Sequence, residues 1–576
     1  MLSIVLAFCY NFHVQKALKT FLIVFPIFFI IIFLVTLGLL NGYFEQDEWL
    51  GIATVMKSYN LPWWSIFIPG QMHFTPVGNI IWGTLYKLFK FQAQYFYLVE
   101  LIVHASVSTL VLILTARLTK NKTIAILTGI LFLLNGRAYQ GFTHLAIFHT
   151  TDTAMFFMLL FFIYITGIKE KILTIKKTII LFLIFFAAAC TREEGFIIIP
   201  ILIVYLLTFG KKMINIKNII PLSLFSVGFI IFLFLRFSAQ SLYTEPIPLK
   251  YQITGYGAKY NLLTLPPKYV VQNLIFYDRI STFYLNNVHK AYPDIESYFT
   301  SQAPLMDAAF FYIFSLILIV FILWLWIIKP KGIVPLLLFC LAWIWSNAFM
   351  LSFAGRNINV IEPRYLYFSG FPVLCLVSMF CYHLFNFKHK LKIVGLVSKI
   401  LAVLLISVLL LTSLQEIRKP VDYANHSGTV KKTVLGNLRH THPILSKNTI
   451  FYIKCKIKCY RNLELGIPNE NVLPFGSGPG LNILLTYASI QGEEKEWGPF
   501  FINNFLFFTY AEDYKKIGDR SFGYFITKTK LEETLKKNKI SKDIVVALEY
   551  NEANYTFKDI SKNFRQTLNV ESGKNE

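Results

Sequence analysis

Long apolar runs alternate with short basic segments along most of the chain. The runs are roughly 20 residues long, the length at which a helix crosses about 30 Å of hydrocarbon. We expect about eleven such spans, and the pattern therefore predicts a polytopic α-helical membrane domain over residues 1–414. The expected spans are residues 19–41, 95–118, 123–135, 151–168, one on each side of 191–195, then 219–237, 308–328, 333–353, 365–385 and 393–414.

Three polar regions interrupt or follow these runs. Residues 42–94 and 238–307 read as long outer loops, the first rich in Trp and Pro and containing a semi-apolar helix at 76–89. From residue 415 the composition becomes mixed and charged. Short strands at 449–454 and 544–548 and a helix at 530–539 predict a small soluble α/β domain over residues 415–576. This domain shows no tetratricopeptide periodicity.

Composition agrees with a membrane protein. Of the 576 residues, 55% are hydrophobic and only 15% are charged, whereas about a quarter of the residues in a soluble domain are charged. The mean hydropathy is +0.54. A soluble globule of this length could not bury so much apolar side chain.

The net charge of +23 is placed in turns between the apolar runs. This is the positive-inside pattern of cytoplasmic loops and not a nucleic-acid-binding face. The basic turns carry Lys120 and Lys122, residues 169–177, Lys211 and Lys212, residues 329–331 and residues 388–392. We therefore expect a cytoplasmic (inner or plasma) membrane protein with its N-terminus inside and its C-terminal domain outside. We expect no removable signal peptide in residues 1–10.

The first outer loop opens with three carboxylates, Glu45, Asp47 and Glu48, next to Trp49. Carboxylates are costly to keep charged beside hydrocarbon, so their presence at the end of a span indicates function. The bland alternative is an ordinary solvated helix end. The same loop carries further aromatic residues, which favours a structured element that lies against the membrane.

Charged side chains also stand at three other outer positions. His149 precedes the fourth span and Asp152 lies at its start, and Arg192 and Glu193 lie in the Thr-Arg-Glu-Glu-Gly turn at 191–195. Arg364 opens a late span within the Glu-Pro-Arg-Tyr-Leu-Tyr stretch that begins at residue 362. An arginine at a span entry can extend harmlessly to the interface, or it can bind an anionic group in bidentate fashion. Spacing alone does not decide between them.

The Asp47-Glu48 pair after the first span, the turn at 191–195 and the stretch at 362–368 together resemble a known superfamily. They are similar to the membrane-integral glycosyltransferases of the C-type fold (GT-C), notably the protein O-mannosyltransferase branch and its bacterial relatives. The resemblance covers residues 16–414 and is stronger in architecture than in motifs, because an acidic pair is a short signature.

The resemblance implies a hexosyltransferase that moves a sugar from a polyprenyl-phosphate donor to an acceptor hydroxyl and inverts the anomeric centre. Asp47 would be the general base, and Glu48 would orient the acceptor or Asp47. Arg364 with Arg192 would stabilise the charge on the departing lipid phosphate. The acceptor is left open between a protein, a lipid and a glycan.

Some relatives use a divalent metal such as Mg²⁺ or Mn²⁺. Asp47 and Asp152 could bind such a metal through their carboxylate oxygens, and His149 could be a further ligand. Glu193 could support the bound acceptor or the metal. No spacing requires a metal, so none is assigned.

Two other classes fit parts of the sequence. A polysaccharide polymerase or ligase shares the polytopic plan and a large outer loop, here with Arg279 and His289 in residues 238–307. A lipid or solute transporter without catalysis would also carry charges in its membrane domain. Against a transporter, the chain shows no internal repeat, and its charged residues lie at one expected face.

Overall fold

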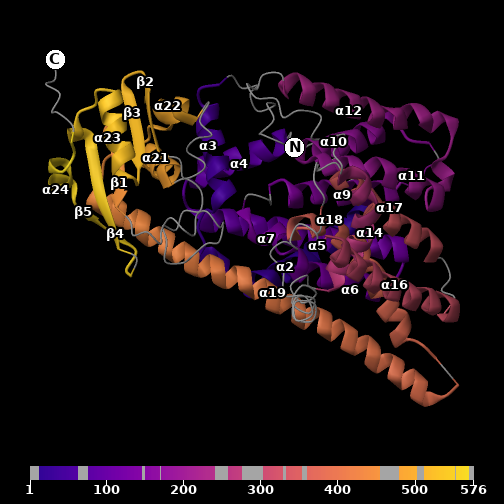
Figure 1. Ribbon diagram of the computed structural model, residues 1–576. Helices are drawn as coiled ribbons and strands as arrows, with labels where there is room; N and C mark the ends of the chain where they lie inside the picture. Colours follow the sequence, from indigo (N-terminus) through magenta and orange to yellow (C-terminus); the bar gives the residue numbers. More distant parts are fainter. Residues whose placement is uncertain are drawn as a thin grey trace. The chain divides into compact units, whose positions relative to one another are not determined.

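The computed structural model describes most of the chain as helices joined by turns (Figure 1). It divides into two compact units. The helical unit comprises Met1–Leu37, Phe67–Gly78 and Val99–Pro420, and the C-terminal unit comprises Gly38–Ile66, Asn79–Leu98 and Val421–Glu576. The described residues are 12–61, 75–145, 149–168, 170, 172–240, 257–275, 303–328, 333–352, 358, 360–388, 390–454, 479–501, 512–551 and 553–569.

A helix is present at each of the expected spans. Six helices in the described part of the chain are long and apolar enough to cross a membrane. α6, α9, α10 and α11 are shorter, and α12 contains a shorter apolar stretch at Ser223–Leu235. The polytopic helical class is confirmed, but helix length does not set the number of crossings. The helices are α2 (Phe12–Val35), α5 (Ala93–Thr119), α6 (Lys122–Leu133), α9 (Thr151–Thr166), α10 (Ile175–Thr191), α11 (Ile198–Thr208), α12 (Ile216–Gln240), α16 (Ala303–Ile328), α17 (Ile333–Ser352), α18 (Pro363–Phe385) and α19 (Lys392–Thr441).

The helical unit has an inner and an outer set of helices. Most side chains of α5 and α18 are buried, whereas few side chains of α2 and α16 are buried. A helix that is apolar on every face and yet exposed suits a lipid environment. Aromatic rings fill the interior: the Trp343 ring centroid lies 5.5 Å from that of Phe162 and 5.1 Å from that of Phe371.

Short elements connect the inner helices. η3 (Gly136–Ala138) and α7 (Gln140–Thr143) join α6 to α9, η4 (Glu193–Ile197) joins α10 to α11, and η5 (Lys211–Met213) joins α11 to α12. The polar region 238–307 contains α14 (Gly257–Leu274), which packs against α16, α17 and α18. Arg279 and His289, named above for a polymerase or ligase, lie outside the described residues.

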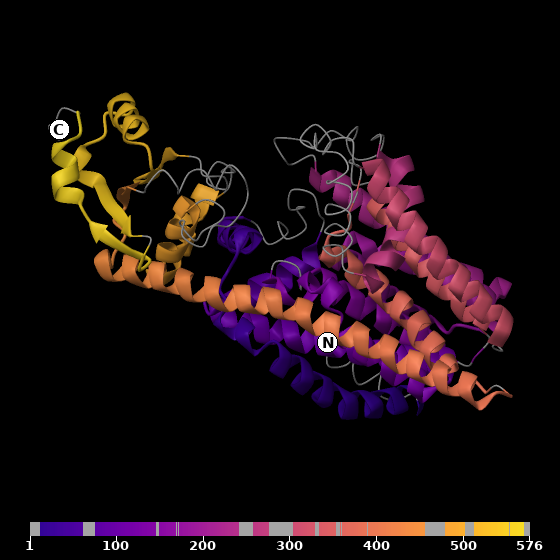
Figure 2. The same cartoon turned by 60° about the horizontal axis from the view of Figure 1, so that its bottom comes forward.

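Helix α19 continues well beyond the expected end of the last span at residue 414. It is one helix that reaches Thr441 and contains Pro420, and Figure 2 shows it as the long orange helix. The change in composition at residue 415 therefore marks where the helix stops being apolar and not where it stops being helical. Because α19 runs through the division after Pro420, its last turns belong to the C-terminal unit.

The C-terminal unit contains the predicted α/β domain. Its five-stranded sheet has the order β2-β3-β1-β4-β5, with β1 parallel to both β3 and β4 and antiparallel edge strands. The predicted strands at 449–454 and 544–548 and the predicted helix at 530–539 are confirmed as β1, β4 and α23. The elements are β1 (Asn448–Lys454), α21 (Pro479–Ile490), α22 (Glu494–Trp497), η7 (Gly498–Phe501), β2 (Asp513–Ile517), β3 (Arg520–Phe525), α23 (Lys528–Lys537), η8 (Lys542–Ile544), β4 (Val545–Asn551), β5 (Thr556–Asp559) and α24 (Ser561–Gln566).

Helices cover both faces of this sheet (Figure 1). Side chains alternate along β1, so Ile450 and Tyr452 pack with Leu531 of α23. Phe451 points to the other face, where its ring lies 6.3 Å from that of Tyr487 on α21. The parallel strands at the centre of the sheet carry apolar side chains on both faces. Helices on each side are needed to bury them.

Part of the predicted first outer loop, residues 42–94, packs with the α/β domain. The loop contains α3 (Gln46–Ser58) and the predicted helix at 76–89, which is present as α4 (Pro76–Phe89). Asn60 Nδ2 donates to the Lys495 carbonyl oxygen at 2.9 Å, and Lys90 pairs with Glu494. The contacts therefore group the segment that carries Asp47 with the C-terminal unit.

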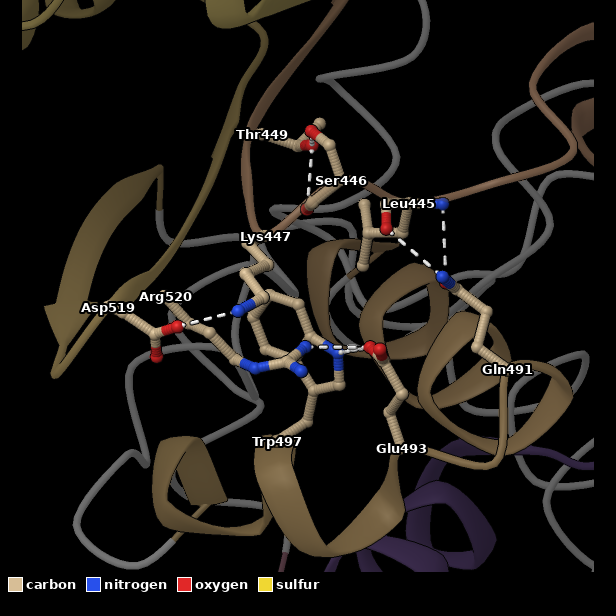
Figure 3. Close-up of polar contacts among 9 residues, drawn as sticks. All are labelled: Leu445, Ser446, Lys447, Thr449, Gln491, Glu493, Trp497, Asp519 and Arg520. Atoms are coloured by element: carbon tan, nitrogen blue, oxygen red, sulfur yellow. Dashed lines mark hydrogen bonds and ion pairs between the residues drawn. The ribbon is translucent and has the colours of Figure 1, made fainter.

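A polar cluster joins the start of β3 to α22 (Figure 3). Arg520 Nη1 donates to Glu493 Oε2 at 2.6 Å, and Trp497 Nε1 donates to the same oxygen at 3.1 Å. The Arg520 guanidinium lies 4.9 Å from the centroid of the buried Trp497 ring. The hydrogen bond from Arg520 lowers the pKa of Glu493 below its ordinary value.

We predict that Glu493→Gln accelerates amide hydrogen exchange in β3 and α22 at pH 7. A group whose pKa is lowered by folding contributes stability above its unfolded pKa, and this contribution is lost as the pH falls through the folded pKa. The wild-type protein should therefore approach the variant only below pH 4.5, the ordinary value for glutamate. Exchange measured by mass spectrometry and corrected for the intrinsic rate tests this. A variant indistinguishable from the wild type at pH 7 would contradict it.

Candidate active site

Three segments of the helical unit meet through one buried arginine. Arg192 follows α10, and its Nη1 donates to the Thr151 hydroxyl at the start of α9. Its Nε donates to Glu194 Oε2 at 2.8 Å, and its guanidinium lies 5.4 Å from the centroid of the Tyr365 ring in α18. The turn at 191–195, the start of α9 and the start of α18 therefore form one cluster.

Local sequence explains how the turn at 191–195 takes this form. Arg192 has an extended backbone that ends α10, and η4 begins at the next residue. A Cβ at Gly195 would lie 2.4 Å from the backbone carbon of Ala188, so only glycine lets the turn fold back against α10. The turn thereby holds Arg192 and Glu193 in buried positions at the helix end.

Arg364 is the second cation of this cluster and is more accessible. It lies in the first turn of α18, after Pro363, and pairs with Glu362 at 2.5 Å. Its guanidinium lies 5.2 Å from the Tyr365 ring centroid, so two guanidinium groups contact one aromatic ring. The Arg364 side chain is 29% exposed, against 7% for Arg192, which makes Arg364 the better placed of the two to meet an added anion.

Asp152 lies beside this cluster in a second, fully buried group. His104 Nε2 lies 3.0 Å from the Leu133 carbonyl oxygen, which can only accept, so Nε2 carries the proton. In the neutral ring, Nδ1 then accepts a hydrogen bond from the Tyr367 hydroxyl at 2.8 Å. One Asp152 carboxylate oxygen lies 3.9 Å from the same nitrogen. A carboxylate and an imidazole are costly to bury in a helix bundle, so their presence here indicates a functional role.

His149 and Glu193 complete the predicted residues of the helical unit. Burial, together with the positive charge of Arg192, lowers the pKa of His149 to about 4. The imidazole is therefore neutral at physiological pH and adds no positive charge to the cluster. Glu193 is buried and interacts electrostatically with Arg192. Among the described residues, no three His, Cys, Asp or Glu side chains form a metal-binding group.

The acidic segment near Asp47 belongs to the C-terminal unit and has its own contacts. Glu48 is buried and accepts a hydrogen bond from the Glu45 backbone N–H at 2.6 Å, which forms a capping box at the start of α3. Glu45 pairs with the buried Lys431 of α19 and accepts from the Ser427 hydroxyl at 2.9 Å. Asp47 lies in the first turn of α3, and its side chain lies outside the described residues.

The structure thus brings together the five predicted residues of the helical unit, whereas Asp47 and Glu48 are part of the other unit. Sequence reasoning missed His104 and Tyr367, because nothing in the spacing connects α5 to α18. It also missed the polar side chains of α14. Polar residues at positions 261, 264, 268 and 272 recur at helical spacing and were the available signal.

Comparison of the chain with known proteins finds a weak structural similarity. No protein-family model matches the chain, and no curated protein matches it. Among solved structures, it is similar to the crystal structure of ArnT from Cupriavidus metallidurans bound to undecaprenyl phosphate. The identity is 9% and the TM-score is 0.41, over 76% of this chain and 83% of that chain. At these values the likeness does not establish a family.

We predict that Lys431→Met and Glu45→Gln each destabilise the protein by about 1–3 kcal/mol, because each leaves a polar partner unsatisfied. The double variant should lose much less than the sum of the two, since the second change removes the group that the first one stranded. Thermal unfolding of the three purified variants measures this. Additive losses would show that the two side chains do not act as a pair.

Proposed function

We propose that this protein is an integral membrane glycosyltransferase. It transfers a sugar from a polyprenyl-phosphate donor to an acceptor hydroxyl at the outer face of the cytoplasmic membrane. The observation that carries the proposal is that two guanidinium groups, those of Arg192 and Arg364, both contact the Tyr365 ring at one end of an apolar helix bundle.

The chemistry of this end of the bundle suits a lipid phosphate. A guanidinium donates two parallel hydrogen bonds to phosphate oxygens, and it does so most strongly where water is scarce. The exposed apolar helices of the same unit suit a prenyl chain in the bilayer. When the sugar leaves its carrier, negative charge grows on the phosphate, and fixed cations stabilise this charge without reorganisation.

The basic turns support a position of the cluster on the outer face. α9 begins with Thr151 at the cluster and ends at Thr166, about 24 Å away for 16 residues of helix. Lys176 and Lys177 then open α10, which returns to Arg192 at its end. Because lysine-rich short loops favour the cytoplasm, the opposite end of these helices faces outward.

Within this proposal, Asp47 removes the proton from the acceptor hydroxyl as it attacks the anomeric carbon from the face opposite the phosphate. Inversion follows from that single displacement. Glu48 holds the helical turn that carries Asp47, as its capping contact with Glu45 allows. Arg364 binds the donor phosphate together with Arg192, and Asp152, His149 and Glu193 are supporting residues.

A transporter is the second candidate, and the buried His104 and Asp152 favour it. Ionisable side chains inside a helix bundle are typical of proton and ion pathways. Transport would require movement of substrate across sealed liposomes without any glycosylated product.

The proposed orientation predicts different labelling of two introduced cysteines in a variant without native cysteines. Glu362→Cys lies beside the cluster and should react with a membrane-impermeant maleimide added to intact cells. Lys390→Cys lies in an exposed basic turn before α19 and should react only after the membrane is permeabilised. The reverse pattern would place the cluster in the cytoplasm and contradict the proposal.

We predict that Asp47→Asn lowers the rate of sugar transfer by about 10²–10⁴-fold, the range that a general base contributes. Expression and thermal stability should stay at wild-type levels, because the amide has nearly the same shape. Membranes are assayed with lipid-linked sugar and the product is identified by mass spectrometry. The exposed Asp543→Asn serves as the matched control and should retain full activity. Full activity of Asp47→Asn would refute its assigned role.

A further inference from the structure

Helix α14 carries a stripe of buried polar side chains that faces the segment leading into α18. The stripe consists of Asn261, Thr264, Lys268 and Gln272, which recur at intervals of three to four residues. A buried polar side chain needs a partner, since an unsatisfied one costs about 1–3 kcal/mol. The partners of this stripe show what α14 holds in place.

Most of these partners are backbone groups of Ser352, Ile358 and Ile361. Asn261 Oδ1 accepts from the Ile358 N–H at 2.8 Å, and Lys268 Nζ donates to the Ile358 carbonyl oxygen at 2.8 Å. Gln272 Oε1 accepts from the Ile361 N–H at 3.0 Å, and Gln272 Nε2 donates to the Ile361 carbonyl oxygen at 3.3 Å. At Ile361, one carboxamide therefore satisfies both polar groups of the same residue.

The hydrogen bonds between Gln272 and Ile361 lie next to the candidate site in the sequence. Ile361 precedes Glu362, the N-cap residue of α18, whose backbone is extended. Pro363 then restricts the chain further, and Arg364 follows in the first helical turn. With so few rotatable bonds between Ile361 and Arg364, the orientation of the Ile361 peptide sets where the Arg364 side chain starts.

The C-terminal end of α14, next to Gln272, is also bonded to groups outside this segment. Asn273 Nδ2 donates to the Ser369 hydroxyl at 2.8 Å, and the Leu274 carbonyl oxygen accepts from Arg137 Nη2 at 2.8 Å. Arg137 Nη1 in turn donates to the Ser413 hydroxyl at 2.7 Å. Because α14 is held from several sides, Gln272 has a firm base from which to hold Ile361.

We infer that Gln272 is a positioning residue for Arg364: its carboxamide holds the Ile361 peptide so that the Arg364 guanidinium stays beside Tyr365 and faces the donor phosphate. This inference rests on the proposed function of Arg364. Gln272 itself does not touch the substrate. Its removal should weaken phosphate binding only while Arg364 is present.

Binding of a polyprenyl monophosphate to the purified full-length protein in detergent tests this, with the corresponding polyprenol as the ligand without phosphate. Gln272→Met preserves side-chain volume but removes both hydrogen bonds, and it should weaken binding of the phosphate by roughly tenfold, equivalent to about 1.4 kcal/mol. Arg364→Ala should weaken binding at least as much. The double variant should bind no more weakly than Arg364→Ala alone, because Gln272 acts through Arg364. Binding of the polyprenol should not change.

Leu263→Ala is the control on the same helix, since its side chain is 67% exposed and lies outside the stripe. It should bind like the wild type. Each variant is first compared with the wild type by size-exclusion elution and thermal stability, and Gln272→Ala replaces Gln272→Met if the latter does not fold.

The outcomes separate the two claims. If Arg364→Ala binds the phosphate normally, the proposed function of the cluster fails. If Arg364→Ala is weakened but the Gln272 variant is not, only the positioning role fails. Equal further weakening in the double variant would show that Gln272 supports the fold in general and would overturn the inference.

Discussion

A guanidinium buried at the end of an apolar helix bundle must be surrounded by acceptors, and the candidate site depends on how Arg192 meets this requirement. Its hydrogen bonds to Thr151 and Glu194 join α9 to the turn after α10, and its contact with Tyr365 adds α18. Without partners, a buried charge would cost several kcal/mol. The segments therefore meet because the charge needs all of them.

Because a buried charge needs partners within the protein, the two arginines have different roles. Arg192 has its hydrogen-bonding capacity directed at protein groups and is nearly inaccessible, whereas Arg364 is partly exposed and has only Glu362 as an ion-pair partner among the described residues. A buried cation can hold the architecture while an accessible one meets the ligand. In the proposed reaction, α14 adds a further layer, because its polar stripe holds the segment from which Arg364 projects.

In the C-terminal unit, the acidic segment before α3 also divides into structural and chemical roles. Glu48 caps α3, and Glu45 pairs with Lys431 of α19. Glu45 and Glu48 therefore have structural roles in this segment. We assign the removal of the acceptor proton to the third carboxylate, Asp47. Since α3 packs with α22 and η7, the loop that carries the proposed base is built together with the α/β domain.

The sequence by itself determined the helices, because each apolar run has to satisfy its own backbone in hydrocarbon, and it determined α4, β1, β4 and α23 through their local patterns. It also marked the charged residues that a membrane domain would not keep without reason. Only the tertiary structure decided that α19 continues past residue 414, that Arg192 and Arg364 both contact Tyr365, and that Asp152 lies beside His104. It also decided that Tyr367 bonds to His104 and that Gln272 bonds to Ile361. These contacts join residues far apart in the chain, and periodicity reports only which face a side chain occupies and not which helix it meets.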